Sequence, residues 1–226
     1  MRVKTNILVF LAIILLSLKE DSGIKITQKS VDGRLYNIYE PYNLKINFTL
    51  SRPDQKDSNI ILCVPGTYTS PQGKPEEFIV IDGQIMQKGD KSWNGYAICG
   101  KPKGYVFISK SHEGFPITED KLSVIQSHLL VYQKTSEHFK PQAKFQRRAL
   151  ATFRYHNEVA IIESEELLDL NEFATDLVNL GVKLAINLDI GAWGEGWYRE
   201  GSGKINKIGQ IPEEGPKQTN WIVFTK

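Results

Sequence analysis

A carboxylate and several aromatic side chains lie close together near the end of the sequence, in the stretch KLAINLDIGAWGEGWYRE (residues 183–200). An apolar strand is predicted there, and it ends at Asp189, before a loop rich in glycine. Asn187 and Asp189 are two positions apart, so on a strand they share one face. A buried carboxylate needs a hydrogen-bond donor or water, because an unpaired one is too costly. Asp189 is therefore expected either to accept hydrogen bonds from the amides of the following loop or to form the floor of a ligand pocket.

The aromatic residues after Asp189 favour a carbohydrate as the ligand of such a pocket. Trp193, Trp197 and Tyr198 would form its walls. The C–H faces of a sugar pack against aromatic rings, while its hydroxyl groups meet polar side chains. Asn187, on the same face as Asp189, is the polar side chain that we expect to contact the ligand.

The elements that position these residues are mostly strands. Alternating or apolar runs predict strands within residues 24–50, 59–65, 77–87, 95–110, 149–164 and 182–190. Asp32-Gly33 and Asp82-Gly83 are the residue pairs that tight hairpin turns prefer. Two further hairpins are predicted, which turn at residues 101–104 and at residues 156–157.

Helices are few in the sequence pattern. The clearest begins after Asp169, with Glu172 completing a capping box and Gly181 as a natural stop. A second helix is expected within residues 117–130, where Thr118 could cap. This order predicts an α+β fold, in which a strongly twisted, mixed and largely antiparallel sheet has a few helices packed against it in a single domain. In sheets with parallel strands, ligands gather outside the carboxyl ends of the strands, where Asp189 would lie.

The composition excludes one class of function and indicates export. The chain of 226 residues has a net charge of +2 without a clustered basic face, so we expect no nucleic-acid partner. Arg2 and Lys4 precede an apolar run from Ile7 to Leu18, which is shorter than the roughly 20 residues of a membrane span. Residues 1–22 are therefore predicted to be a signal peptide and residues 23–226 the exported periplasmic or extracellular domain. An uncleaved membrane anchor is the alternative, and the oligomeric state is open.

The two cysteines, Cys63 and Cys99, both lie in apolar strand-like runs. Export would permit a disulfide between them, whereas apolar surroundings also suit two free thiols. No pair of Cys or His residues has the spacing of metal ligands. We therefore expect neither a metal nor another cofactor.

Four ordered segments resemble the phosphodiester glycosidase (uncovering-enzyme-like) domain family. They are CVPGTYTSPQGKPEEFIVIDGQI (63–85), IQSHLLV (125–131), RRALATFRYHNEVAIIES (147–164) and FATDLVNLGVKLAINLDIGAW (173–193). The resemblance implies the family's α+β fold and cleavage of the bond between an anomeric carbon and a phosphodiester. A carbohydrate or sugar-phosphate ligand is thus the implied partner.

The family resemblance also implies roles for individual residues. Asp189 matches the family's acid, where a carboxylate stabilises an oxocarbenium-like centre or activates water. Arg148 matches its hairpin arginine, one place from Arg147, and would hold a phosphate oxygen. His128 could act as acid or base near neutral pH. The other residues that the resemblance or the pocket hypothesis assigns to the substrate are Tyr68, Gln126, Asn187, Trp193, Glu195 and Trp197.

Departures from the family pattern leave three functions open. Val64 and Pro65 replace the Asn and Gly of the first turn, and bulky Ile190 follows the acid where the family has small residues. Glu195 is either a second carboxylate of the site or a solvated loop acid, and Arg148 could simply pair with Asp189. The chain is therefore expected to be a divergent hydrolase of sugar-phosphodiesters, a non-catalytic carbohydrate-binding relative, or a structural domain.

Overall fold

The computed structural model describes residues 22–89, 93–100, 105–153, 159–190, 196–209 and 218–226. Its strands form three sheets, in which every strand pairing between described residues is antiparallel. The seven-stranded sheet has the spatial order β1 (Gly23–Val31), β2 (Arg34–Tyr42), β13 (Val159–Ser164), β12 (Arg148–Thr152), β14 (Leu184–Leu188), β10 (Leu129–Tyr132) and β11 (Thr135–Ser136).

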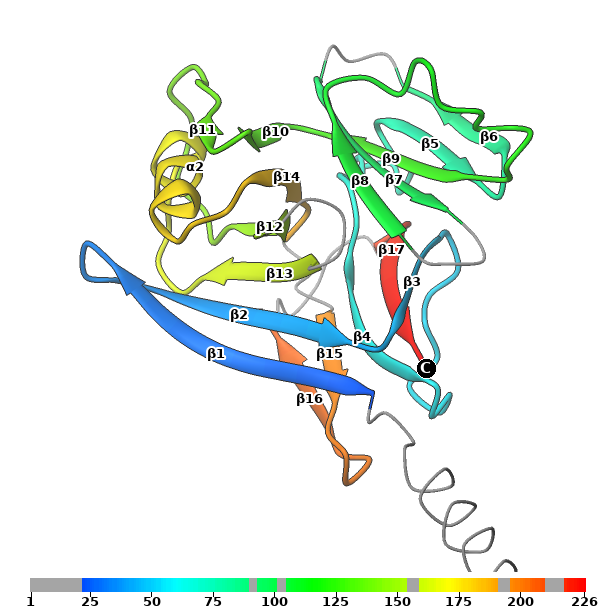
Figure 1. The fold of residues 1–226 in the computed structure, drawn as a ribbon, viewed down its shortest axis with the longest axis horizontal. Coiled ribbons are helices and arrows are strands. Elements are labelled where there is room, and N and C mark those ends of the chain that lie inside the picture. The colour runs from blue at the N-terminus through cyan, green and yellow to red at the C-terminus, as the bar shows by residue number, and fades with distance from the viewer. Residues whose placement is uncertain (1–21, 90–92, 101–104, 154–158, 191–195, 210–217) are drawn as a thin grey trace, which may run out of the picture.

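The other two sheets have five strands each (Figure 1). The C-terminal sheet has the order β16 (Ile205–Ile208), β15 (Gly196–Arg199), β4 (Ile60–Pro65), β17 (Trp221–Thr225) and β3 (Lys45–Thr49). The small sheet, at the upper right of Figure 1, has the order β6 (Gln84–Lys88), β5 (Phe78–Ile81), β9 (Ser123–Ser127), β7 (Gly95–Gly100) and β8 (Tyr105–Ser109).

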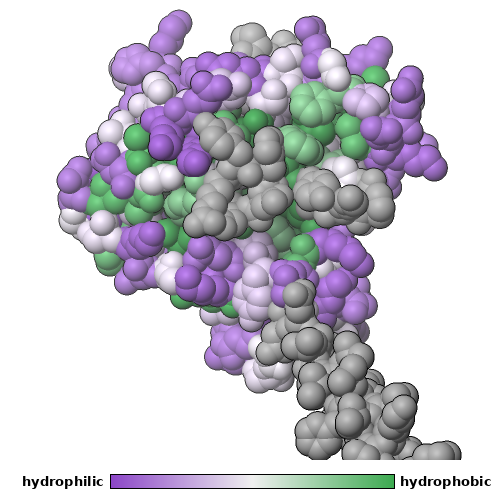
Figure 2. Space-filling model, viewed as in Figure 1, coloured by the Kyte–Doolittle hydropathy of each residue, from purple (hydrophilic) through white to green (hydrophobic). Residues whose placement is uncertain are grey.

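One hydrophobic core is shared by all three sheets. Its buried side chains include Leu150 and Ile186 from the seven-stranded sheet, Leu62 and Phe224 from the C-terminal sheet, and Ala97 and Ile125 from the small sheet. Because no sheet can bury its apolar face without the others, the sheets pack as one unit. Hydrophilic residues occupy most of the rim in Figure 2, and hydrophobic ones gather toward the middle of the view.

The helix α2 (Leu170–Asn179) covers the opposite face of the seven-stranded sheet, beside β10 and β11 (Figure 1). Its predicted capping box is confirmed. The Asp169 side chain accepts from the amide of Glu172 at 2.9 Å, and the Glu172 side chain accepts from the amide of Asp169 at 3.0 Å. Gly181 follows the helix with a φ of 91°, a backbone conformation that favours glycine. No helix in the described part of the chain is long and apolar enough to cross a membrane.

Local turn chemistry predicted the hairpins correctly. Asp32-Gly33 joins β1 to β2 and Asp82-Gly83 joins β5 to β6, and φ is positive at all four residues. β7 pairs with β8 and β12 pairs with β13, as predicted, although their turns lie outside the described residues.

Three expectations about the fold are corrected. The segment 117–130 forms turns followed by β9 and β10 instead of a second helix, because Val124, Ile125 and Leu129 are needed in buried strand pairings. The strands form three antiparallel sheets instead of one mixed sheet. The fold is therefore mainly β, and its described residues contain a single helix.

Both cysteines are buried thiols, and no disulfide joins them. Cys99 lies in the shared core and its thiol donates to the carbonyl of Ile46 at 3.0 Å. Cys63 lies on the other face of the C-terminal sheet, beside Trp197 and Trp221. Each thiol thus packs as a small apolar side chain.

A buried charge cluster fixes α2 to β2. Asp176 is fully buried, and Arg34 donates to its two carboxylate oxygens, at 2.6 Å each, while the hydroxyl of Tyr36 donates a short hydrogen bond to it. Hydrogen bonding to Asp176 raises the pKa of Arg34, which remains charged. The positive charge of Arg34 and the hydroxyl of Tyr36 therefore compensate the buried negative charge of Asp176.

We predict that Asp176→Ala destabilises the fold by about 3–5 kcal/mol, because it leaves two polar groups without a buried partner. Lys144→Ala is the matched control. It removes the solvent-exposed ion pair between Lys144 and Glu172 and should cost less than about 1 kcal/mol. Urea denaturation measures both free energies of unfolding, and equal losses for the two variants would contradict this account.

Candidate functional site

The three sheets meet at the end of β14. The amide of Asn187 donates to the carbonyl of His128 at 2.8 Å, and the amide of Asp189 donates to the carbonyl of Gly66 at 2.7 Å. His128 is the single residue between β9 of the small sheet and β10 of the seven-stranded sheet, and Gly66 directly follows β4 of the C-terminal sheet. We call the residues Gly66–Thr69, His128 and Asn187–Asp189 the three-sheet junction.

The turn after β4 is held by a side chain from the far end of the chain. Asn220 accepts from the amide of Thr67 at 2.7 Å and donates to the carbonyl of Thr67 at 2.9 Å. A Cβ at Gly66 would lie 2.3 Å from Asn220 Oδ1, so only glycine allows this approach. Gln218 adds a second donor to the same carbonyl, at 3.1 Å. These contacts position Tyr68 and Thr69 against β14.

Two buried carboxylates flank this turn. Asp189 is 4% exposed, and its Oδ2 accepts from the amide of Thr69 at 3.3 Å. Glu77 is fully buried and accepts from the hydroxyl of Thr67 at 2.6 Å. Asp189 thus accepts a hydrogen bond from a backbone amide, as in the first of the two expectations for this carboxylate. The amide belongs to the turn after β4.

Aromatic rings surround the junction. The ring of Tyr68 lies edge-on to Trp93, with centroids 4.9 Å apart, and Trp93 lies 4.4 Å from the ring of His128. His128 also contacts Phe139, at 5.6 Å. All four side chains are half-buried, so part of each ring reaches solvent.

Asn187 presents an unsatisfied acceptor at this site. It is 2% exposed, and its Nδ2 donates to the hydroxyl of Tyr68 at 2.6 Å and to the carbonyl of Leu188 at 3.1 Å. Its Oδ1 is buried and has no hydrogen-bond partner among the described residues. Leaving such a group unpaired costs about 1–3 kcal/mol, which a donor on a ligand or a water would recover.

The two neighbouring arginines point to opposite sides of the seven-stranded sheet, since side chains alternate along a strand. Arg148 lies opposite Glu163 and Leu188, on the core face. It is fully buried, and its guanidinium forms an ion pair with Glu163 through Nε at 2.7 Å and through a short bond from Nη2. The partner of Arg148 is therefore Glu163, and the pairing with Asp189 that the sequence left open is not formed.

Arg147 lies on the other side of the sheet, as does Asn187. Its Nε donates to the carbonyl of Leu168 and its Nη2 to the carbonyl of Ala143, both at 2.8 Å. No carboxylate in the described ranges forms an ion pair with it, although the residue is only 6% exposed. Burial lowers the pKa of Arg147, and the nearby Tyr68 and Asp169 oppose this shift. Among the described residues, the hydrogen bonds of this buried cation thus go to neutral carbonyl oxygens, and its guanidinium also contacts the ring of Phe145.

The remaining sequence-predicted residues lie elsewhere. Gln126 uses its amide within the small sheet, where Oε1 accepts from Phe78 at 3.1 Å and Nε2 donates to the carbonyl of Trp93 at 2.5 Å. Trp197 is 3% exposed and lies on the outer face of the C-terminal sheet. Trp193 and Glu195 lie outside the described residues. Of the predicted set, the structure brings together Asp189, Asn187, Tyr68 and His128.

Sequence reasoning missed several residues that surround the junction. Arg147 entered only as the neighbour of Arg148. No sequence motif pointed to Trp93, Glu77, Gln218 or Asn220. No group of three or more His, Cys, Asp or Glu residues in the described part of the chain is arranged to hold a metal ion.

The fold is shared with a known glycosidase. The structure is similar to that of the zebrafish N-acetylglucosamine-1-phosphodiester alpha-N-acetylglucosaminidase catalytic domain auto-inhibited by its pro-peptide, with a TM-score of 0.61 and 14% sequence identity. The match covers 91% of this chain and 82% of that one. No family model and no curated protein matches the sequence. The chain therefore has a distant, divergent phosphodiester glycosidase-like fold.

Burial raises the pKa of the Tyr68 phenol, Asp189 and Glu77 add to the shift, and Arg147 opposes it. The folded phenol therefore keeps its proton above pH 10, where an unfolded tyrosine ionises. This stabilisation is complete below about pH 10 and is lost as the pH rises toward the folded pKa.

We predict that the free energy of unfolding of the wild type falls above pH 10, by up to about 1.4 kcal/mol per pH unit for each such tyrosine. Tyr68→Phe should show a shallower fall, because one titrating group is gone. Denaturation curves between pH 9 and 11.5 measure both slopes. If the free energy of unfolding fell equally steeply with pH in the two proteins, burial would not raise the pKa of Tyr68.

Proposed function

We propose that this chain is a divergent phosphodiester glycosidase-like protein that binds a sugar-phosphodiester at the three-sheet junction. The buried charge of Arg147, which forms no ion pair among the described residues and interacts electrostatically with Tyr68, is the observation that carries the proposal. A buried charge needs a partner, and an anionic ligand would supply one. A guanidinium also matches the geometry of a phosphate group.

The surrounding groups suit the sugar part of such a ligand. Tyr68, Trp93 and His128 offer half-buried ring surfaces, against which C–H faces can pack. Asn187 Oδ1 offers an acceptor for a sugar hydroxyl. Phosphate and sugar groups would thus be recognised by different sides of the junction, in keeping with the substrate named for the zebrafish enzyme.

Hydrolysis would follow from the same arrangement. The bond between the anomeric carbon and the phosphate oxygen breaks, and the phosphate leaves with the bonding electrons. Water then adds its hydroxyl to the anomeric carbon and gives up a proton. The carboxylate of Asp189 is the group that would stabilise the positive charge on the anomeric carbon or take the proton from water. Arg147, in place of Arg148, would stabilise the negative charge of the departing phosphate.

Two observations favour a non-catalytic carbohydrate-binding relative as the second candidate. Arg148, the arginine that matches the family motif, is neutralised by Glu163 in the core. Pro65 and Val64 stand where the family has small or amide residues. Either candidate would act on glycoconjugates outside the cytoplasm if the N-terminal segment directs export.

We predict that the methyl diester of N-acetylglucosamine 1-phosphate binds to the purified protein and that Arg147→Gln weakens this binding about tenfold or more. Such a loss corresponds to one charge-assisted hydrogen bond. Lys144→Gln, which removes an exposed cation, is the matched control and should bind as the wild type does. Isothermal titration calorimetry measures the affinities.

Release of N-acetylglucosamine separates the two candidates. Release that disappears in the nearly isosteric Asp189→Asn would establish the hydrolase, whereas binding without release would establish the non-catalytic relative. Absence of binding in the wild type, or equal affinities for Arg147→Gln and Lys144→Gln, would refute the proposal.

A further inference from the structure

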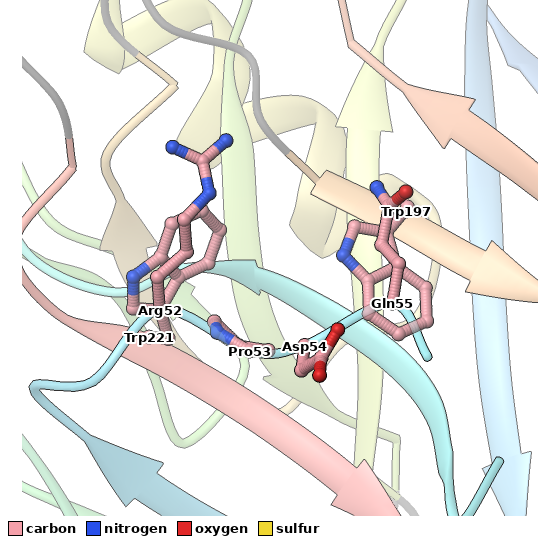
Figure 3. Close-up of a pocket in the computed structure, with 6 residues that line it drawn as sticks. All are labelled: Arg52, Pro53, Asp54, Gln55, Trp197 and Trp221. Carbon is pink, nitrogen blue, oxygen red and sulfur yellow. The ribbon is translucent and has the colours of Figure 1, made fainter. Parts of the chain in front are cut away.

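A polar cavity lies on the outer face of the C-terminal sheet, away from the three-sheet junction. Its volume is about 380 Å³, and it is lined by Arg52, Pro53, Asp54, Gln55, Trp197 and Trp221 (Figure 3). Trp197 of β15 pairs with Cys63, and Trp221 of β17 pairs with Pro65, two positions further along β4. The two indoles therefore lie on one face of the sheet, opposite to the shared core. None of these lining residues belongs to the three-sheet junction.

The chain segment that forms the rim is fixed in place. The Arg199 guanidinium donates to the carbonyls of Gln55 at 2.7 Å, Asp57 at 3.1 Å and Ile60 at 3.0 Å. The Asp54 carboxylate accepts from the amide of Lys56 at 2.8 Å. The cavity therefore exists before any ligand binds, so binding would not have to order the rim.

Two polar groups in the cavity wall lack a protein partner. Trp221 is 2% exposed, and its indole Nε1 is buried without a hydrogen bond in the described part of the chain. The side-chain amide of Gln55 is exposed and also has no partner among the described residues. A neutral oxygen acceptor on a ligand could satisfy the indole, whose unpaired burial is unfavourable.

The charges and shape of the cavity select the kind of ligand. Figure 3 shows Arg52 running along Trp221, Gln55 next to Trp197, and the Asp54 carboxylate between the two indoles. The Arg52 guanidinium lies 5.9 Å from the centre of the Trp221 ring. One positive and one negative side chain give the lining no net charge, in contrast to Arg147 at the junction. A neutral ligand with several hydroxyl groups suits this lining better than an anion does.

We propose that this cavity is a second binding site, which takes one neutral sugar residue of a glycan. The Asp54 carboxylate accepts hydrogen bonds from sugar hydroxyls, the Gln55 side-chain amide both accepts and donates, and the Trp221 indole donates to a sugar oxygen. The volume lies at the small end of the range for ligand pockets, which suits a single ring. Trp197 and Trp221 are too buried to serve as open stacking platforms, so they act as the apolar wall behind the rim.

The test uses the full chain and sugars without phosphate. N-acetylglucosamine, glucose, galactose, mannose and their β-1,4-linked disaccharides are titrated, with tryptophan fluorescence and saturation-transfer NMR as readouts. We expect millimolar or tighter binding of at least one sugar and a loss of about fivefold or more in Gln55→Ala, which corresponds to one hydrogen bond. Gln55→Ala keeps the carbonyl that Arg199 contacts, so the rim should stay folded.

Two further variants make the result decisive. Asp54→Asn, which keeps the side-chain oxygen that contacts Lys56, should also weaken binding, whereas Lys56→Ala, at an exposed neighbouring position, should not. Asp54 and Gln55 lie outside the three-sheet junction, so a loss of affinity in their variants separates this site from the junction. No saturable response to any sugar, or unchanged affinity in Gln55→Ala and Asp54→Asn, would overturn the proposal.

Discussion

Two backbone hydrogen bonds at the end of β14 tie the three sheets to one point. The amides of Asn187 and Asp189 donate to His128, between the small and the seven-stranded sheet, and to Gly66, at the end of the C-terminal sheet. Every group of the candidate site depends on these contacts. The side-chain amide of Asn187 donates to the Tyr68 hydroxyl, and the backbone amide of Thr69 donates to the Asp189 carboxylate. Both hydrogen bonds require that the turn after β4 is held against β14.

The alternation of side chains along β12 separates two arginines of adjacent sequence into different roles. Arg148 is paired with Glu163 and contributes to the packing between the sheets. Arg147 is almost as buried but contacts only carbonyl oxygens and the ring of Phe145. One position along a strand thus decides whether a buried arginine pairs with a carboxylate in the sheet or hydrogen-bonds to carbonyl groups.

Features that depend on neighbouring residues could be predicted from the sequence. The pairing of strands that are distant in the sequence could not. The turns at Asp32-Gly33 and Asp82-Gly83, and the capping box at Asp169, depend on a few neighbouring residues. The segment 117–130 was predicted as a helix because Thr118 could cap it, yet strand pairing across the sheets determines its structure.

Parts of the candidate site could also be predicted, and the reason that the rest could not is physical. Asp189 and Asn187 were found because a polar residue at the end of an apolar strand stands out in one sequence. The argument used there, that ligands gather at the ends of parallel strands, does not apply, since β14 is antiparallel to β12 and β10. Asn220 contacts Thr67 across 153 positions, and only the completed fold brings them together.

Chemical-shift mapping tests the central claim most directly. The protein, labelled with ¹⁵N, is titrated with N-acetylglucosamine 1-phosphate, and the amide resonances are followed. The account predicts that the largest saturable shifts fall on Thr67 to Thr69, His128, Arg147 and Asn187 to Asp189, since these residues come from all three sheets yet surround one site. Shifts confined to other parts of the chain, or no saturable shift, would contradict it.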